Sequence, residues 1–207
     1  IDFAILSHGH YDHGGGMETF LQINKNAPIY ISRHAFENHY NGTKKFIGLD
    51  KQISKNNRLI FTEDYLEISA NFELFSCNKE NHPYKTNPFG LTIFEDNTFY
   101  PEDFRHEQYF LIHENDKRIL FSGCSHKGIL NIMEWFKPNI LIGGFHFKDL
   151  DPSDKDDTRL FEAAQILKTY NTKYFTCHCT GVDQFNFLKS IMNQQLEYIS
   201  TGQIIEI

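Results

Sequence analysis

Short apolar runs separated by polar turns recur along the whole chain and predict many short strands. Asp2–Leu6 predicts a buried strand at the start, and Gln108–His113 with Arg118–Phe121 predicts a β-hairpin. The other predicted strands are Pro28–Ser32, Asn139–Ile142, Lys173–Thr176, Leu196–Ser200 and Gln203–Ile207, together with three antiparallel strands at Arg58–Thr62, Tyr65–Ser69 and Phe72–Ser76.

Helical periodicity is clearest in the second half of the chain. The segment Asp157–Tyr170 predicts an amphipathic helix whose apolar positions are Leu160, Phe161, Ala164, Ile166 and Leu167. Further helices are predicted at Met17–Asn24, Gly128–Phe136 and Val182–Met192, with a helical turn at Arg33–Asn38.

The segment Cys77–Phe104 has the least regular pattern. It contains Pro83, Pro88 and Pro101 and many aromatic residues. A long irregular segment within a compact domain is usually a lid or a binding loop, or else disordered, and the aromatic residues favour a lid. We therefore predict one domain over residues 1–207 with a lid-like loop at about residues 77–107, and a small local core of aromatics is the alternative.

Side chains that can bind a metal ion are most concentrated in Ser7–Gly16, directly after the first predicted strand. This segment places His8, His10, Asp12 and His13 before a cluster of glycines. Imidazole nitrogens and carboxylate oxygens suit zinc and its first-row neighbours. Alternate residues of an extended segment point the same way, so His8, His10 and Asp12 are predicted to converge, while the glycines let His13 turn back. Four donors this close are better shared between two adjacent ions than wrapped around one.

Three later turns also carry histidines, and each follows the C-terminal end of a predicted strand. They are Gly123–His126, Gly143–His146 and Cys177–Cys179. Ligand sites gather at that edge of such sheets. The pattern favours two sheets flanked by helices, with the chemistry concentrated in the turns.

The segment Ile5–Gly15 resembles the signature of the metallo-β-lactamase superfamily. Within it, Ser122–Asn131, Ile142–His146 and His178–Gly181 resemble the dihydropterin ribofuranosyl-aminobenzene phosphate synthase-like subgroup of metal-dependent hydrolases. The resemblance implies an α+β fold, the four-layer αββα sandwich. Members usually carry several strands before the first motif. We therefore expect a fold without its N-terminal strands, whose sheet edge favours pairing with a neighbouring chain.

The resemblance also implies a ligand set. His8 and His10 would bind a first metal ion, Asp12 and His13 a second, and His178 would complete the second ion's shell.

The third ligand of the first ion has three candidates. Cys124 stands where many relatives place a bridging aspartate, and His126 follows two residues later. We rank His126 above Cys124 because one turn presents one of these side chains more easily than both. His126 as a capping or core residue is the alternative. His106, before the predicted hairpin, competes more weakly with His126.

His146 follows a double glycine, which allows the backbone to approach a ligand closely. We predict that it acts as a catalytic residue beside Asp12, in contact with the substrate or the transition state. A plain surface histidine is the alternative. The remaining histidines are predicted to lie on the surface: His34, His39, His82 and His113.

These residues predict an enzyme, a binuclear metal-dependent hydrolase with two divalent ions. Zinc is the first candidate, and manganese or iron are alternatives. A bound metal lowers the pKa of water from about 15.7 to about 7, so a metal-bridged hydroxide is expected to attack a small anionic, for example phosphorylated, substrate. The resemblance also allows a synthase-type ribosyl or pterin condensation that releases diphosphate. A metal-binding protein without turnover is a further reading. A flavodiiron-type oxidoreductase is disfavoured because the chain has no room for a flavin domain.

The amino-acid composition limits the classes of partner and the cellular compartment that we expect for this protein. With 207 residues, of which 40% are hydrophobic, the chain can form a sizeable core. The net charge of −7 argues against nucleic acid as a partner, and no apolar run reaches the length of a membrane span. The 4 cysteines suit a reducing compartment better than a disulfide framework. We expect a cytoplasmic protein that acts on a small-molecule substrate and has the option of forming a homo-oligomer.

Overall fold

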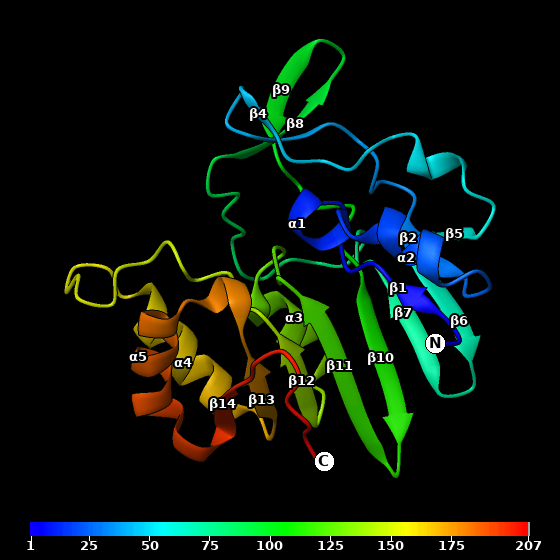
Figure 1. The fold of residues 1–207 in the computed structure, drawn as a ribbon. Helices are drawn as coiled ribbons and strands as arrows, with labels where there is room; N and C mark the ends of the chain where they lie inside the picture. The colour runs from blue at the N-terminus through cyan, green and yellow to red at the C-terminus, as the bar shows by residue number, and fades with distance from the viewer. Residues whose placement is uncertain (207) are drawn as a thin grey trace. The chain divides into compact units, whose positions relative to one another are not determined.

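The computed structural model describes residues 1–206, and the chain divides into two compact units. The first unit comprises Ile1–Asn81 and Thr86–Phe110, and the second comprises His82–Lys85 and the chain from Leu111 onward. Both units combine strands with helices (Figure 1), as expected for the predicted α+β class. The single domain with a lid-like loop stays a prediction.

The first unit is built from short strands in three groups. The parallel sheet has the order β1 (Ala4–Ile5), β2 (Ile29–Ser32) and β5 (Leu59–Thr62). The antiparallel sheet has the order β4 (Lys45–Phe46), β3 (His39–Asn41), β8 (Leu91–Glu95) and β9 (Thr98–Pro101). The antiparallel hairpin consists of β6 (Tyr65–Ser69) and β7 (Phe72–Phe75). The helical segments are α1 (Tyr11–Gly14), α2 (Met17–Ile23) and the 3-10 helix η1 (Ile53–Lys55).

Two sequence predictions for this unit were wrong in detail. β5 pairs with β2 in parallel, not with its successor in an antiparallel sheet. The segment predicted as irregular contains the β8–β9 hairpin. Its turn residues Asp96 and Asn97 both have positive φ angles, 47° and 62°, as the type I′ turns that match strand twist require.

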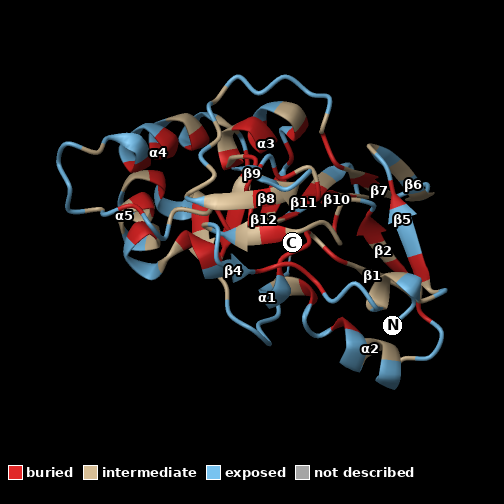
Figure 2. Ribbon diagram, turned by 90° about the horizontal axis from the view of Figure 1, so that it is seen from above, coloured by how far each residue is buried: buried red, intermediate tan, exposed pale blue. Residues whose placement is uncertain are grey.

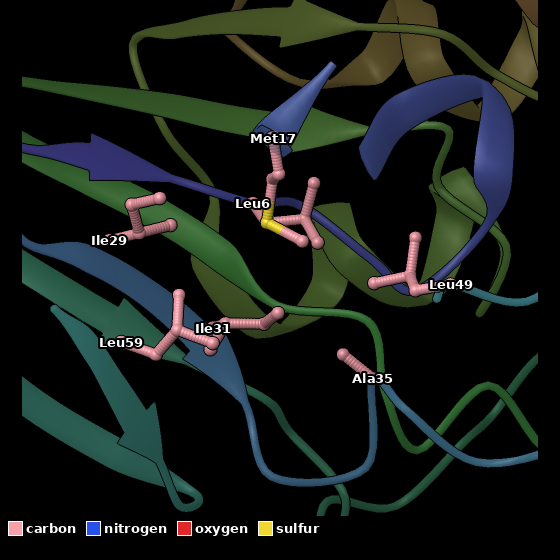
Figure 3. Close-up of a cluster of buried hydrophobic side chains, with 7 residues drawn as sticks. All are labelled: Leu6, Met17, Ile29, Ile31, Ala35, Leu49 and Leu59. Carbon is pink, nitrogen blue, oxygen red and sulfur yellow. The ribbon is translucent and has the colours of Figure 1, made fainter. Parts of the chain in front are cut away.

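The hydrophobic core of the first unit includes the residues on either side of the Ser7–Gly16 motif. Figure 3 shows its buried side chains: Leu6, Met17, Ile29, Ile31, Ala35, Leu49 and Leu59. Leu6 directly precedes the motif, and Met17 opens the helix that follows it. The core therefore holds the motif at both of its ends.

The second unit has a largely parallel sheet. Strands β14, β13, β12 and β11 are parallel neighbours, and β10 lies beside β11. The strands are β10 (Tyr109–Glu114), which begins in the first unit, β11 (Lys117–Gly123), β12 (Ile140–Gly143), β13 (Lys173–Thr176) and β14 (Leu196–Tyr198). The helical segments are α3 (Ile129–Phe136), α4 (Arg159–Thr169), α5 (Val182–Met192) and the 3-10 helices η2 (His178–Thr180) and η3 (Asn193–Gln195).

Local sequence explains these elements. Asn115 and Asp116 join β10 to β11 with positive φ angles of 48° and 62°, another type I′ turn. Lys137 ends α3 in the left-handed conformation directly before Pro138. On α4 the buried residues are Leu160, Ala163, Ala164 and Leu167, and Figure 2 shows exposed residues along the rest of this helix. The predicted amphipathic helix is confirmed, but Phe161, one of its predicted apolar positions, is 51% exposed.

The predicted closing strand Gln203–Ile207 is wrong for residues 203–206, which are not in a strand, and its last residue lies outside the described residues. Within residues 1–206, no helix has the length and apolar character needed to cross a membrane.

Candidate metal centre

The Ser7–Gly16 motif is a loop followed by one helical turn, not a continuous extended segment. His10 has extended backbone angles (φ −85°, ψ 146°) and precedes α1 as its N-cap, whereas Asp12 and His13 lie within α1. The backbone N–H groups of His13 and Gly14 both donate to the carbonyl oxygen of His10, at 3.0 Å. A helical turn, rather than strand alternation, therefore presents Asp12.

The donors of the motif gather around His8. Its ring centroid lies 4.8 Å from that of His10 and 4.1 Å from that of His13. Oδ2 of Asp12 lies 3.5 Å from Nε2 of His13. His8 and His10 are buried, while the Asp12 side chain is 44% exposed. Three imidazoles and a carboxylate at this spacing form the donor set that zinc-type ions take, so these residues fit a metal ion.

Ser7 orients the His8 ring, because its Oγ lies 3.0 Å from Nδ1 of His8. When Nδ1 carries the hydrogen and donates to this hydroxyl, Nε2 keeps its lone pair for a metal. Histidines that bind metals usually use their second nitrogen in this way.

Gly9 lets the backbone between His8 and His10 pass close to Ala35. A Cβ at this position would overlap the carbonyl oxygen of Ala35, so only glycine fits without a shift of the backbone. The Gly9 N–H donates to Nδ1 of His106 at 2.8 Å, and this hydrogen bond is buried. His106 is thus next to the motif. From the sequence it is a weaker candidate for the third ligand of the first ion.

His106 belongs to a second cluster in the first unit. His10, His39, Glu102 and His106 each offer a ligand atom, and these atoms all lie within 4.8 Å of one another, which fits a metal ion. All four residues are buried, so the prediction that His39 lies on the surface was wrong. The predictions for the other three divided: His82 is exposed, whereas His34 and His113 are half-buried.

Sequence reasoning missed His39 and Glu102. The three-residue strand β3, which places His39 opposite Ile93 of β8, is too short for a periodic pattern to mark its buried face. Glu102 follows Pro101 at the end of β9, with no motif around it.

The second unit brings its three histidine-bearing turns to one sheet edge. β11, β12 and β13 are adjacent and parallel, so the turns after them lie at the same ends of the strands. The rings of His126 and His146 are 4.3 Å apart, and Sγ of Cys179 donates to the carbonyl oxygen of Cys124 at 3.5 Å. His178 is exposed at the start of η2.

Backbone strain is concentrated in these turns. Ser125, His146 and His178 have positive φ angles of 58°, 55° and 49°, a region that non-glycine residues seldom adopt. A Cβ at Gly143 would overlap Oγ of Ser122, and one at Gly144 would overlap Sγ of Cys179. Close packing around Gly143 and Gly144 holds these turns in place. Strained backbone persists only where the surrounding structure constrains it in this way.

The cysteines differ in their suitability as donors. Cys124 and Cys179 are buried, and Cys177 is half-buried. Burial, and then the nearby Cys179, raise the pKa of the Cys177 thiol above its usual value. The thiolate that binds metals is therefore disfavoured at Cys177 in the metal-free protein.

Two curated relatives come from Methanocaldococcus jannaschii. An uncharacterized protein is 26% identical over 215 residues, which span 100% of this chain and 78% of that protein. The 7,8-dihydropterin-6-methyl-4-(beta-D-ribofuranosyl)-aminobenzene-5'-phosphate synthase is 26% identical over 228 residues, which span 100% of this chain and 75% of that protein.

Solved structures share the fold. A metal-dependent hydrolase of the beta-lactamase superfamily matches with a TM-score of 0.79 and 23% identity, over 98% of this chain and 78% of that one. An isothiocyanate hydrolase from Delia radicum gut bacteria matches with a TM-score of 0.54 and 12% identity, over 100% of this chain and 77% of that one. The chain therefore has the metallo-β-lactamase fold, as predicted. The family model described as the metallo-beta-lactamase superfamily matches residues 1–170, and since this is most of the chain, the protein belongs to that superfamily.

Proposed function

We propose that this protein is a hydrolase that requires two divalent metal ions, with zinc as the first candidate and manganese or iron as alternatives. The observation that carries the proposal is the gathering of three motif imidazoles, with ring centroids 4.8 and 4.1 Å from that of His8, and the Asp12 carboxylate beside His13. Membership of a superfamily of metal-dependent hydrolases supports it.

The motif residues differ in burial, and this difference suits them to different roles. His8 and His10 are buried donors with little freedom to move, so they suit tight, permanent coordination. The Asp12 side chain is 44% exposed, so solvent reaches it, and it suits both metal binding and the orientation of a nucleophilic water. When bound by these residues, divalent ions would supply a water of lowered pKa and would stabilise negative charge on the substrate.

The other predicted residues belong to the second unit. Cys124, His126 and His178 are the proposed further metal donors, and His146 is the proposed contact to the developing oxyanion. The support is their position in turns at one sheet edge and the 4.3 Å separation of the His126 and His146 rings. His126 remains preferred over Cys124 because an imidazole reaches further from the turn.

The proposed substrate is a small anionic molecule, in the first place a phosphate ester. The support is the phosphate in the name of one relative and the positive charge that two bound divalent ions would present to an anion. The partner is thus proposed to be a small molecule rather than a macromolecule.

Metal content tests this proposal. Plasma mass spectrometry of the purified protein is expected to find two zinc-type ions per chain, and anomalous scattering is expected to place them at the motif. His8→Ala and His13→Ala are each expected to lose metal, while His113→Ala, which removes an imidazole from β10, is expected to keep it. A wild-type protein that takes up no zinc, manganese or iron would refute the metal centre.

A synthase reaction is the second candidate, because one relative carries that name and aligns with the whole chain. There the ions would hold a diphosphate leaving group instead of activating water. Hydrolysis of a chromogenic phosphodiester in added zinc or manganese favours the hydrolase. Turnover only when a ribosyl diphosphate and an aromatic acid are both present favours the synthase. Metal binding without either reaction would leave a binding protein.

A further inference from the structure

Three buried residues outside the Ser7–Gly16 motif, His39, Glu102 and His106, lie together in the first unit. The side chains of all three are 0% exposed. Neither the proposed hydrolysis nor the predicted ligand set for the motif gives His39 and Glu102 any task. Burying polar groups costs folding free energy unless they are hydrogen-bonded, so three buried polar side chains in one place indicate a role.

The tautomer of His106 follows from its backbone contact. Nδ1 of His106 accepts a hydrogen bond from the N–H of Gly9 at 2.8 Å. A ring nitrogen that accepts cannot carry a hydrogen, so the neutral ring holds its hydrogen on Nε2. The lone pair of Nδ1 is used by Gly9, and Nε2 is an N–H group. In this arrangement His106 has no lone pair to give to a metal ion.

Glu102 lies between the two histidines. Its Oε2 is 2.7 Å from Nδ1 of His39, and its Oε1 is 3.9 Å from Nε2 of His106. Nε2 of His39 lies 3.3 Å from the carbonyl oxygen of His34. Oε1 also accepts from the backbone N–H of Phe104 at 3.2 Å. The carboxylate thus holds the His39 ring by a hydrogen bond and lies beside the His106 ring.

His106 lies next to the metal motif. Gly9 stands between His8 and His10, and its N–H is held by His106. Two residues beyond His106, the backbone N–H of Gln108 donates to the carbonyl oxygen of Ser7 at 2.8 Å, and its Nε2 donates to that of Leu6 at 2.7 Å. The segment from Glu102 to Gln108 therefore anchors the motif loop.

We propose that His106, Glu102 and His39 are positioning residues that set the direction of His8 and His10 through the Gly9 amide, and that His106 is not a metal ligand. This inference rests on the proposed metal centre at His8 and His10. It removes His106 from the candidates for the first ion's third ligand and gives His39 and Glu102 a role.

A cation held jointly by His10, His39, Glu102 and His106 is the competing arrangement, since their ligand atoms lie close enough. It would require His106 to give up either the Gly9 hydrogen bond or the Nε2 hydrogen. It would also replace the 2.7 Å contact between His39 and Glu102. The observed hydrogen bonds favour the positioning role.

Nitrogen-15 NMR of the wild-type protein tests the tautomer directly. In the metal-free protein, His106 is expected to show an unprotonated Nδ1 and a protonated Nε2, and the Gly9 amide is expected to exchange slowly with solvent. Zinc addition is expected to leave both His106 nitrogens unchanged while it shifts those of His8 and His10. Loss of the His106 Nε2 hydrogen on zinc addition would overturn the inference.

A pair of variants tests the positioning role. In His106→Asn the side-chain oxygen stands near the former Nδ1 and can accept from Gly9, whereas in His106→Gln the polar group stands near the former Nε2. We expect His106→Asn to keep the zinc affinity and the cobalt absorption spectrum close to wild type. We expect His106→Gln to lose about 10- to 100-fold in zinc affinity. Equal losses in both variants, or equal retention in both, would contradict the role.

The outcomes separate this inference from the proposed function. If wild-type protein binds no metal, the metal centre fails, and the Gly9 exchange rate in metal-free His106→Asn and His106→Gln still decides the positioning role. Slow exchange in His106→Asn with fast exchange in His106→Gln supports it, and equal exchange rates overturn it. Circular dichroism of each variant shows whether it is folded, and the wild-type NMR measurement depends on no variant.

Discussion

The carbonyl oxygen of Ala35 occupies the space that a Cβ on Gly9 would need. Ala35 is fully buried in the turn after β2, and its own N–H donates to the carbonyl oxygen of Ser32 at 3.0 Å. The turn therefore cannot retreat without breaking its own packing. The spacing between His8 and His10 depends on this close approach of two backbone segments.

Gly9→Ala is expected to weaken metal binding by about 10- to 100-fold, the range seen when the support of a metal ligand is lost. The methyl group must push the backbone between His8 and His10 away from Ala35. Overpacking is also expected to lower the free energy of unfolding by about 1–3 kcal/mol. Zinc titration and urea denaturation measure the two effects.

The matched control is Gly16→Ala, because nothing lies within 4 Å of a Cβ built at Gly16. Its backbone is in the right-handed helical region, with φ −82° and ψ −4°, so alanine is tolerated there. This variant is expected to bind zinc as wild type does. Equal zinc affinity in both glycine variants would contradict the argument.

Ile31→Ala is expected to lower the free energy of unfolding by about 2–5 kcal/mol. Ile31 is fully buried on β2, the middle strand of the β1-β2-β5 sheet, within the core shown in Figure 3. Its truncation leaves a cavity beneath the motif. Urea denaturation followed by circular dichroism measures the loss.

The control for this variant is Ile23→Ala at the end of α2, where the side chain is 78% exposed. It is expected to change the free energy of unfolding by less than about 0.5 kcal/mol. If Ile31→Ala were as mild as Ile23→Ala, the core around β2 would not be what stabilises this unit.

The sequence predicted much of the second unit well because its helices are long and its turns are determined by local sequence. The pattern of Leu160, Ala164 and Leu167 on α4 and the turn at Asn115 and Asp116 each depend on nearby residues alone. The same holds for the strands before the histidine-bearing turns, whose parallel neighbours are set by the helices between them.

The first unit was harder to predict because its short strands pair over long sequence distances. β3 lies beside β8, more than fifty residues later, so no local pattern places His39 in the interior. The donors in the motif were predictable from their density in the sequence. Glu102 and His39 were not, because their partnership exists only after the chain folds.

Alkaline pH is expected to destabilise wild-type protein more than Tyr109→Phe. Burial, followed by the charge and hydrogen bond of Glu107 and then by Cys77, raises the pKa of Tyr109 well above its usual value. The hydroxyl donates to Oε2 of Glu107 at 2.7 Å. The unfolded tyrosine loses its proton near pH 10 while the folded one keeps it, so stability falls as pH rises above about 10.

The slope from this one group is at most about 1.4 kcal/mol per pH unit, and it is present only above pH 10. Urea denaturation at pH 9, 10 and 11 is expected to show a steeper loss for wild type than for Tyr109→Phe. The variant is expected to be less stable than wild type at pH 9, because Glu107 loses a hydrogen-bond donor. Parallel pH profiles for the two proteins would contradict the burial of an un-ionised Tyr109.

Removal of bound metal is expected to lower the melting temperature, because a ligand that binds only the folded protein stabilises it in proportion to its occupancy. Zinc at a hundred times its dissociation constant contributes about 2.7 kcal/mol. Calorimetry with EDTA, and again after excess zinc, is expected to show a reversible shift in wild type. His13→Ala, which removes a donor beside Asp12, is expected to show a smaller shift, and His113→Ala is expected to match wild type. A wild-type melting curve that responds to neither EDTA nor zinc would mean that the motif imidazoles gather around His8 for a purely structural reason.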